Sequence, residues 1–256
     1  MLNSYEILVD LHTHTLFSEH AYSTVRENIA CAKENRLAGL AVTDHFYQRD
    51  DFLFRKNELV RMFYVSKNVS SENFFVISGG EFNLGQKLHP DVNVEKLYKN
   101  VKWRLAGLHT WFVDIPNLRI EDVPQLFKSM LTSNEYVKPT AFAHIERELY
   151  KCIGADDTKK MRDTLYDIVD LAVDHNLFLE INESSLITDE CGGVERMECW
   201  LERAKERNAM FSLGSDAHYC ESVGRFDNAI ALINSMGINK NDILNLDMWA
   251  IDGLRG

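Results

Sequence analysis

The sequence predicts an α/β fold with a parallel sheet, and a barrel of seven strand–helix units is the simplest form of it. Short apolar runs alternate with amphipathic stretches along nearly all of the 256 residues, as in sheets with helical crossovers. The seven candidate strands span residues 7–11, 39–43, 74–78, 105–108, 140–143, 178–181 and 210–213. The length fits one (β/α) barrel, although the pattern alone also permits a doubly wound open sheet.

Two helices stand out by the spacing of their apolar residues. The first follows the fifth candidate strand, and its apolar face comprises Met161, Leu165, Ile168 and Ala172. The second follows the sixth, and its apolar face comprises Met197, Trp200, Leu201 and Ala204. The range 46–72 is the least regular and is expected to form a lid or a long crossover. Since no linker or composition break interrupts the chain, one domain is expected over residues 1–256.

Composition and charge narrow the possible partners. The chain has 39 acidic and 28 basic residues, a formal net charge of −11, and no Lys/Arg-rich run. Nucleic acid and membrane are therefore not expected as partners, although net charge does not exclude a small anionic substrate. The five cysteines form no CxxC pair, so a disulfide framework is not expected. The N-terminus lacks a secretory pattern, and a cytoplasmic location is expected.

The positions of the histidines indicate a metal site. Seven of the nine lie at or just beyond the carboxyl end of a candidate strand, and these are His12, His14, His20, His45, His109, His144 and His218. The active sites of βα barrels form at that end because the βα loops converge there. One such histidine alone is more often structural. Seven in one predicted layer favour metal ligation.

Local spacing gives a physical reason for ligation. His12 and His14 are two residues apart on an extended chain, so both imidazoles are expected on one side. The segment GSDAHY repeats that spacing with Asp216 and His218. Glu81 ends the third candidate strand, after two glycines that allow close backbone approach. Imidazole and carboxylate ligands without cysteine suit zinc, manganese or iron.

Other polar residues near these motifs are expected to support the site or to play no part in it. Asp10 and Asp44 are expected to face away from the adjacent ligands and to fix imidazole orientation. His175 lies at the end of a predicted helix, where a capping or exposed position is expected. Cys220 lies near the last motif and is expected to be a bystander.

The motifs together resemble a known family. In order, DLHTHTLFSEHAYSTVRENI, AVTDH, ISGGEFN, AGLHT, AFAH, LEINESS and LGSDAH are similar to segments of the PHP superfamily, named for polymerase and histidinol phosphatase domains. The resemblance runs from Asp10 to Asn245 and is strongest to small bacterial stand-alone phosphatases with a trinuclear metal site. It implies a distorted (β/α)7 barrel, in agreement with the seven candidate strands.

The resemblance also implies which residues bind three divalent ions, with zinc favoured and manganese or iron also compatible. The first ion takes His12, His14, Glu81 and Asp216. The second shares Glu81 as a bridge and takes His109 and His144. The third takes His20, His45 and His218. Seven neutral imidazoles and two carboxylates carry −2 and three divalent ions carry +6, so the net +4 attracts a phosphate dianion.

The reaction implied is hydrolysis of a small phosphomonoester by a metal-activated hydroxide. Glu81, Asp216 and His218 are the residues expected to act in catalysis through the metals. Arg147 and Arg225 are candidate phosphate contacts because a guanidinium presents a planar fork of donors. A surface salt bridge is the more usual role of an arginine in such a position, and it is kept as the competing interpretation of each.

Two other functions remain open. One is histidinol-phosphate phosphatase, from another branch of the same superfamily. The other is a non-catalytic metal-binding module, although the complete ligand set and the lack of an attached polymerase argue against it. The sequence departs from the family pattern beside two ligands, at Thr110, Trp111, Ile145, Glu146 and Arg147. These positions are expected to border the cavity, so the resemblance does not extend to the substrate.

Overall fold

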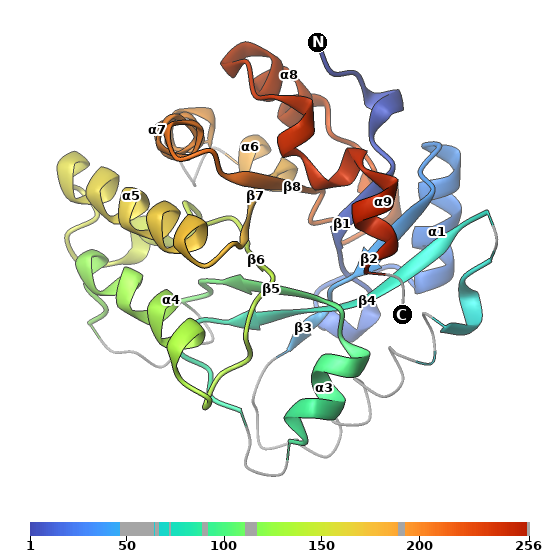
Figure 1. The fold of residues 1–256 in the computed structure, drawn as a ribbon, viewed down its shortest axis with the longest axis horizontal. Helices are drawn as coiled ribbons and strands as arrows, with labels where there is room; N and C mark the ends of the chain where they lie inside the picture. Colours follow the sequence, from blue (N-terminus) through green and yellow to red (C-terminus); the bar gives the residue numbers. More distant parts are fainter. Residues whose placement is uncertain are drawn as a thin grey trace.

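A nearly closed barrel of parallel strands, covered by helices, forms the body of the molecule (Figure 1). The computed structural model describes residues 1–46, 64, 67–71, 73–88, 92–110, 117–188 and 193–254. In barrel order the strands are β1 (Val9–Thr13), β2 (Gly39–Val42), β4 (Phe75–Asn83), β5 (Trp103–Gly107), β6 (Ala141–Phe142), β7 (Phe178–Asn182) and β8 (Met210–Gly214). A further short strand, β3 (His45–Phe46), pairs with β4. The predicted seven-stranded barrel is confirmed, and β3 was not anticipated.

The barrel closes between its first and last strands at their carboxyl ends. Thr13 forms a parallel bridge with Ala217, just beyond β8. The amide of His14 donates to the Ala217 carbonyl oxygen at 2.9 Å, and the amide of Asp216 donates to that of His12 at 2.8 Å. Closure therefore places the two predicted ligand pairs of the first and last strands side by side.

A bulge in β1 decides which side chains enter the barrel. Val9 pairs with Gly39 and Thr13 pairs with Val42. Between these two pairs β1 therefore contains one more residue than β2. An extra residue reverses the alternation of side chains along a strand. Leu11 consequently packs in the interior core, and the next residue, His12, also joins the site.

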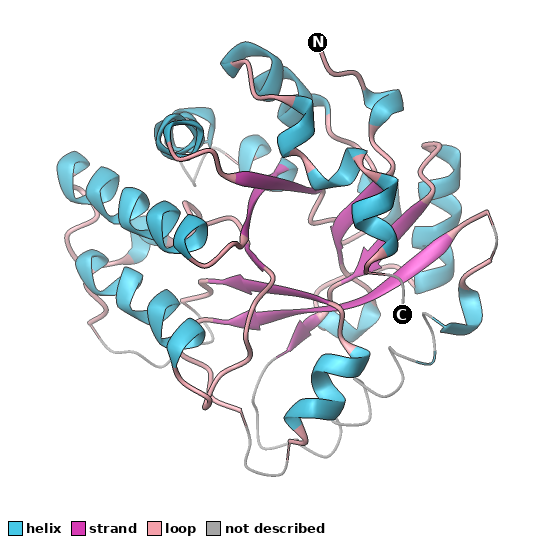
Figure 2. Ribbon diagram, in the orientation of Figure 1, coloured by secondary structure: helices cyan, strands magenta, loops and turns pink. Residues whose placement is uncertain are grey.

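Helices surround the barrel (Figure 2). They are α1 (Val25–Glu34), α3 (Val94–Asn100), α4 (Val123–Thr132), α5 (Thr158–Asp174), α6 (Glu183–Ile187), α7 (Gly193–Glu206), α8 (Asp227–Met236) and α9 (Met248–Asp252). The short 3-10 helices are η1 (Ser4–Glu6), η2 (Leu16–Ser18), η3 (Ile120–Asp122), η4 (Leu149–Lys151), η6 (Cys220–Ser222), η7 (Lys240–Asp242) and η8 (Leu244–Leu246). The two predicted apolar faces belong to α5 and α7, and all eight of their residues are buried. Among the described helices, none is long and apolar enough to cross a bilayer.

Side-chain caps fix where helices begin and end. Thr24 and Glu27 form a capping box at the start of α1, which also anchors the end of the loop that carries His20. Asp157 accepts hydrogen bonds from two amides in the first turn of α5. At the C-terminal end of α8, Gly237 adopts the left-handed conformation with φ of 63°.

The apolar core has two layers. The larger lies between the strands and the outer helices, and it includes Leu40, Phe142 and Leu213. The smaller fills the amino-terminal part of the barrel interior, where Trp103 is fully buried, and Ile251 of α9 packs against it. Because apolar side chains fill the amino-terminal part of the barrel interior, the polar interior residues lie at its carboxyl end.

Most of the irregular range 46–72 lies outside the described residues, so the predicted lid or crossover there stays a prediction. The strand bounds differ from the sequence-based ones at several ends. β1 begins two residues later than expected, and β4 continues to Asn83, so Glu81 lies within a strand and not at its end.

Candidate metal centre

All nine predicted ligands lie together at the carboxyl end of the barrel. β1 carries His12, the loop that follows carries His14 and His20, and β3 and β4 carry His45 and Glu81. The remaining ligands come from the loops after β5, β6 and β8, and they are His109, His144, Asp216 and His218. The imidazole rings stack closely, with centroids 4.3 Å apart for His14 and His218 and 4.4 Å apart for His14 and His45.

The carboxylate of Glu81 lies at the centre of this cluster and is 1% exposed. Five imidazole nitrogens surround its two oxygens. Those nearest Oε2 belong to His45 (2.9 Å), His12 (3.3 Å) and His14 (3.4 Å). Those nearest Oε1 belong to His144 (2.7 Å) and His109 (3.2 Å). Burial alone raises the pKa of Glu81, but the facing imidazoles, led by His45, outweigh it and hold that pKa well below its usual value.

The expected pairing of His12 and His14 is present. Their Nε2 atoms are 3.0 Å apart, and Oδ1 of Asp216 lies 3.0 Å from Nε2 of His14 and 3.4 Å from Nε2 of His12. Ligand atoms about 2.0–2.2 Å from a tetrahedral zinc ion are separated from one another by about 3.3 Å. The three side chains therefore already have the spacing of a metal-binding group.

The same spacing argument is wrong for Asp216 and His218. β8 ends at Gly214, and Asp216 adopts a left-handed conformation with φ of 54°, so this pair does not lie on an extended strand. Nδ1 of His218 nevertheless lies 3.6 Å from Oδ1 of Asp216, and its Nε2 lies 2.8 Å from Nε2 of His20. His144 also has a positive φ, 32°. Strained backbone of this kind is concentrated at functional sites.

The charge states around the cluster suit cation binding. Burial lowers the pKa of His45 to about 3, and burial together with the neighbouring imidazoles lowers that of His14 well below its usual value. Neutral imidazole is the form that binds metal. Burial also lowers the pKa of His12, but the nearby carboxylates, led by Glu180, outweigh it and raise that pKa well above normal. The carboxylates of Glu180, Asp216 and Glu81 around His12 therefore favour a positive charge at this point of the site.

Glu180 is a site residue that the sequence interpretation missed. Its Oε1 lies 2.6 Å from Nδ1 of His12, and its Oε2 accepts the amide hydrogen of His144 at 3.1 Å. A Cβ added at Gly214 would overlap Glu180 Oε1, so the glycine leaves room for this carboxylate. Glu180 belongs to the quoted segment LEINESS, but it lies within β7 and not at a strand end, where ligands were sought. Such a carboxylate fixes the tautomer and orientation of a metal-binding imidazole.

Arg147, a predicted phosphate contact, is tied into the cluster. Its guanidinium donates from Nη1 to Asp216 Oδ2 at 2.5 Å, from Nη2 to Asn182 Oδ1 at 2.7 Å and from Nε to Ser185 Oγ at 3.1 Å. The side chain is 17% exposed, so the alternative of a surface salt bridge is wrong for this residue. Arg225 lies in the loop after β8, is exposed, and forms no side-chain hydrogen bond or ion pair with the residues that the structure describes.

The two predicted supporting carboxylates act in different ways. Asp44 accepts a hydrogen bond from Ser18 Oγ at 2.6 Å, and that oxygen lies 2.9 Å from Nδ1 of His14, so Asp44 supports an imidazole through a serine. Asp10 instead accepts three backbone amides from β1 and the loop after β8, the closest from Gly224 at 2.9 Å. It holds the chain and not an imidazole.

The positions that depart from the family pattern do not all border the site. Ile145 and Glu146 are buried, and the Glu146 carboxylate accepts a hydrogen bond from Trp200 of α7 at 3.1 Å, which corrects the expectation that both line the cavity. Thr110 donates to Glu148 at 2.6 Å beside the cluster. Trp111 lies outside the described residues.

The remaining predictions concern residues outside the cluster. His175 is exposed at the end of α5, as expected. Cys220 is half-buried, and its thiol hydrogen-bonds to Glu221. Among the contacts of the described residues, neither His175 nor Cys220 forms an ion pair or a hydrogen bond with Glu81.

The donor set fits divalent metal ions. Groups of three with ligand atoms within 4.8 Å of one another are His14, His45 and His218; His12, His14 and Glu81; His45, Glu81 and His109; and His12, His144 and Glu180. The buried Nδ1 atoms of His109 and His144 have no hydrogen-bond partner among the described residues. The Nε2 atoms of the same two rings are the ones that face Glu81 and could bind a cation beside it.

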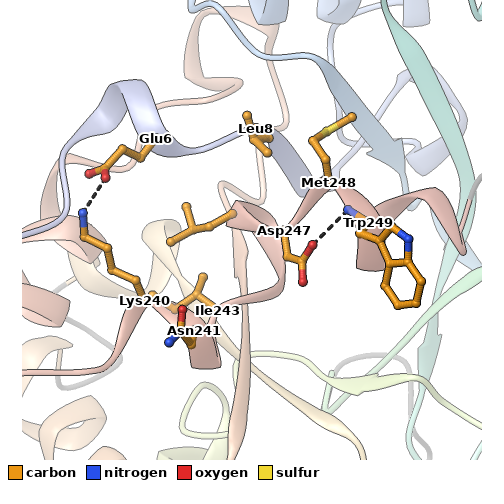
Figure 3. A pocket seen from close by; sticks show the side chains of 9 residues that line it. Glu6, Leu8, Lys240, Asn241, Ile243, Asp247, Met248 and Trp249 are labelled. Carbon is orange, nitrogen blue, oxygen red and sulfur yellow. Dashed lines mark hydrogen bonds and ion pairs between the residues drawn. The ribbon is translucent and has the colours of Figure 1, made fainter.

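A second hollow lies elsewhere. A pocket of about 760 Å³ is lined by Leu8, just before β1, by Lys240 and Ile243, and by Met248 and Trp249 of α9 (Figure 3). It lies at the amino-terminal side of β1 and contains no histidine, so it is separate from the metal centre. The chemistry-bearing residues mark the functional site, and the pocket does not.

The fold and the site together define a metal-dependent barrel enzyme, because imidazoles and carboxylates converge where βα loops build active sites. The family model described as the PHP domain matches residues 10–184, more than half of the chain. The protein belongs to the PHP family.

Relatives and solved structures agree with this membership. The chain is 29% identical over 249 residues to a probable phosphatase of Vibrio atlanticus, with 93% of this chain and 89% of the relative covered. It is 30% identical over 241 residues to a probable phosphatase of Shewanella loihica, covering 94% and 90%. The fold is similar to a histidinol phosphate phosphatase from Lactococcus lactis solved with zinc, L-histidinol and phosphate, with a TM-score of 0.61, 16% identity, and 91% and 95% of the chains covered.

Proposed function

We propose that this protein, a metal-dependent phosphatase, hydrolyses small phosphomonoesters at a site for three divalent ions. The observation that carries the proposal is the Glu81 carboxylate, which is buried and contacted by five imidazoles on its two oxygens. A carboxylate so surrounded is suited to bridge two cations, with separate imidazoles on each side. The names of the relatives as probable phosphatases support the same reaction class.

Zinc is the favoured ion, with manganese and iron as alternatives, because the donors are imidazole and carboxylate. The first ion is assigned to His12, His14, Glu81 and Asp216. The second is assigned to Glu81, His109 and His144, and the third to His20, His45 and His218. His14 lies within reach of the third group as well, since its ligand atom falls within 4.8 Å of those of His45 and His218.

When bound, the ions supply positive charge for the phosphate oxygens and acidify a water molecule for attack on phosphorus. The residues of the chain then have positioning roles. Glu180 orients His12, Ser18 and Asp44 orient His14, and Arg147 orients Asp216. This arrangement keeps the donors fixed at the positions that the ions require.

Two arginines are proposed to contact the phosphate. Arg147 makes three described hydrogen bonds and so retains two N–H groups for a phosphate oxygen. Arg225 presents an exposed guanidinium from the loop after β8. Their charges complement a phosphate dianion, and Arg147 also offsets the charge of Asp216 within the site.

A phosphate-release screen tests the proposal. Purified protein is stripped with a chelator, reloaded with zinc, manganese or iron, and assayed on a panel of phosphomonoesters that includes histidinol phosphate. We expect hydrolysis of several small monoesters that is lost on stripping and restored on reloading. Absence of hydrolysis across the panel with metal bound would favour a non-catalytic metal-binding module. A preference of several hundredfold for histidinol phosphate would favour that alternative activity.

A further inference from the structure

The candidate metal centre is open to solvent at one edge only among the described residues. The side chains of His12, His14, His45, His109 and His144, together with Glu81 and Asp216, are at most 6% exposed. His218 has a side chain that is 23% exposed, and His20 beside it is also half-buried. The organic part of a bound ester must extend towards solvent, so it passes the edge formed by His20 and His218.

Three large, exposed apolar side chains belong to residues whose backbone lies beside that edge. Leu16, Tyr22 and Tyr219, here called the apolar rim, are 55%, 77% and 52% exposed. Tyr219 directly follows His218 in the chain. The amide of Tyr22 donates to the carbonyl oxygen of His218 at 2.7 Å, so the two tyrosines leave the backbone at neighbouring points. The amide of Leu16 donates to the carbonyl oxygen of Ser23, so the backbone of Leu16 lies next to the residue that follows Tyr22.

Both tyrosine rings have free faces. Among the described residues neither Tyr22 nor Tyr219 stacks on another ring or lies beneath a cation, in contrast to ring pairs of the core such as Phe127 and Phe142. Exposing several large apolar side chains together at the mouth of a site is typical of ligand contact. Tyrosine provides a large flat surface with little rotamer freedom to lose on binding.

The other side of the mouth has the opposite character. In barrel order β5 lies across from the junction of β1 and β8. There, Thr110 donates to Glu148, whose carboxylate also pairs with Lys151 at 2.7 Å. The charged groups described on this side are paired with each other, whereas the apolar rim is the uncharged exposed surface among the described residues beside the centre.

We propose that the apolar rim binds the leaving group of the substrate and selects phosphomonoesters of aromatic or heteroaromatic alcohols. This inference rests on the proposed phosphatase function. A flat ring stacks on an aromatic side chain with an advantage equivalent to about 2- to 10-fold in affinity over contact area alone. The rim therefore names the substrate class that the metal centre by itself leaves open.

Two esters that differ only in aromaticity test the proposal. Benzyl phosphate and cyclohexylmethyl phosphate have the same carbon count and a similar alcohol leaving group, and the ratio of their kcat/KM values isolates the flat ring. We expect the metal-loaded protein to prefer benzyl phosphate by about 2- to 10-fold. Tyr219→Leu and Tyr22→Leu should each reduce that ratio, while Tyr219→Phe and Tyr22→Phe, which keep the ring, should retain it.

Trp249→Leu is the matched control, because Trp249 is an exposed aromatic residue, 88% exposed, beside the pocket at the amino-terminal side of β1. It should leave the ratio unchanged. A ratio near one in the unmodified protein, or one that the leucine variants do not alter, would overturn the proposal while leaving phosphatase activity intact.

A binding measurement separates this inference from the reaction itself. Calorimetric titration of the metal-loaded protein with benzylphosphonate and cyclohexylmethylphosphonate, neither of which is hydrolysed, reports on the rim even if no ester is turned over. Tighter binding of the benzyl compound, lost in Tyr219→Leu, would support the rim. Equal affinities would refute it. Failure of every ester to be hydrolysed would refute the proposed function alone.

Discussion

The Arg147 guanidinium is bound to the Asp216 carboxylate, with Nη1 and Oδ2 2.5 Å apart. This contact uses one oxygen of Asp216 and leaves Oδ1 directed at His12 and His14. Arg147 is itself held by Asn182 and Ser185. The ion pair therefore fixes which oxygen of Asp216 is offered to a metal ion.

Arg147→Lys is expected to lower kcat by about 10- to 100-fold, the usual effect of losing a partner that orients a ligand. Lysine keeps the charge, but one ammonium cannot reproduce the planar fork that reaches three acceptors. The bound metal per chain, measured by elemental analysis, should fall in parallel. Arg119→Lys, in an exposed pair with Glu121, is the control and should change neither quantity. A higher KM with full metal content and unchanged kcat would assign Arg147 to the phosphate alone.

Glu180→Gln is expected to weaken metal binding by about 10- to 100-fold. The amide keeps the shape of the side chain but removes the negative charge that faces Nδ1 of His12. Competition with a chelator of known affinity measures the change. Exposed Glu135→Gln, in a surface pair with Lys87, provides the control. Metal affinity equal to that of the parent would show that Glu180 does not orient a ligand.

Gly214→Ala is expected to abolish most activity, because the added Cβ would overlap both Glu180 Oε1 and the Cβ of His12. Both neighbours belong to packed strands, so neither can move aside without displacing the site. Gly237→Ala is a useful comparison: a Cβ there meets nothing within 4 Å, although its φ of 63° adds backbone strain. It should cost about 1 kcal/mol of stability and leave kcat unchanged. Activity of Gly214→Ala close to that of the parent would contradict the close fit.

The fold and the nine converging side chains could be predicted because they depend on local patterns. Periodicity located α5 and α7, and ordered motifs placed ligands at strand ends. β3 was not predicted, because a strand of two residues, His45–Phe46, has no periodicity to detect. The bounds of β1 were not predicted correctly, because its bulge depends on pairing with β2. The residues of one strand alone do not show that pairing.

Long-range partners were the other limit. Glu180 contacts His12 across 168 residues of sequence, and Arg147 contacts Asp216 across 69. Only the closed barrel brings these pairs together. The sequence identified Arg147 as a cation near the site. Its partner, the Asp216 carboxylate, could not be predicted, because the contact depends on where β6 and β8 end in the folded barrel.

Metal content gives a direct test of the trinuclear assignment. Fully loaded protein is expected to bind about three divalent ions per chain, since the nine candidate ligands with one bridging carboxylate suffice for three. Elemental analysis after loading and removal of free metal measures the number. Saturation at one ion per chain would contradict the assignment, and His175→Gln should match the parent because His175 is exposed away from the cluster.

The last prediction contrasts two substitutions to glutamine. Glu81→Gln is expected to reduce kcat by at least about 100-fold, the order expected for losing a main source of transition-state stabilisation. The amide retains the shape, but it lacks the negative charge that the two bridged cations are proposed to share among the five surrounding imidazoles. His175→Gln should keep kcat within a few-fold of the parent. Circular dichroism first establishes that both variants are folded, and both are then assayed at saturating metal. Equal losses in two folded variants would refute the placement of the site at the strand ends, and full activity of Glu81→Gln would refute its bridging role.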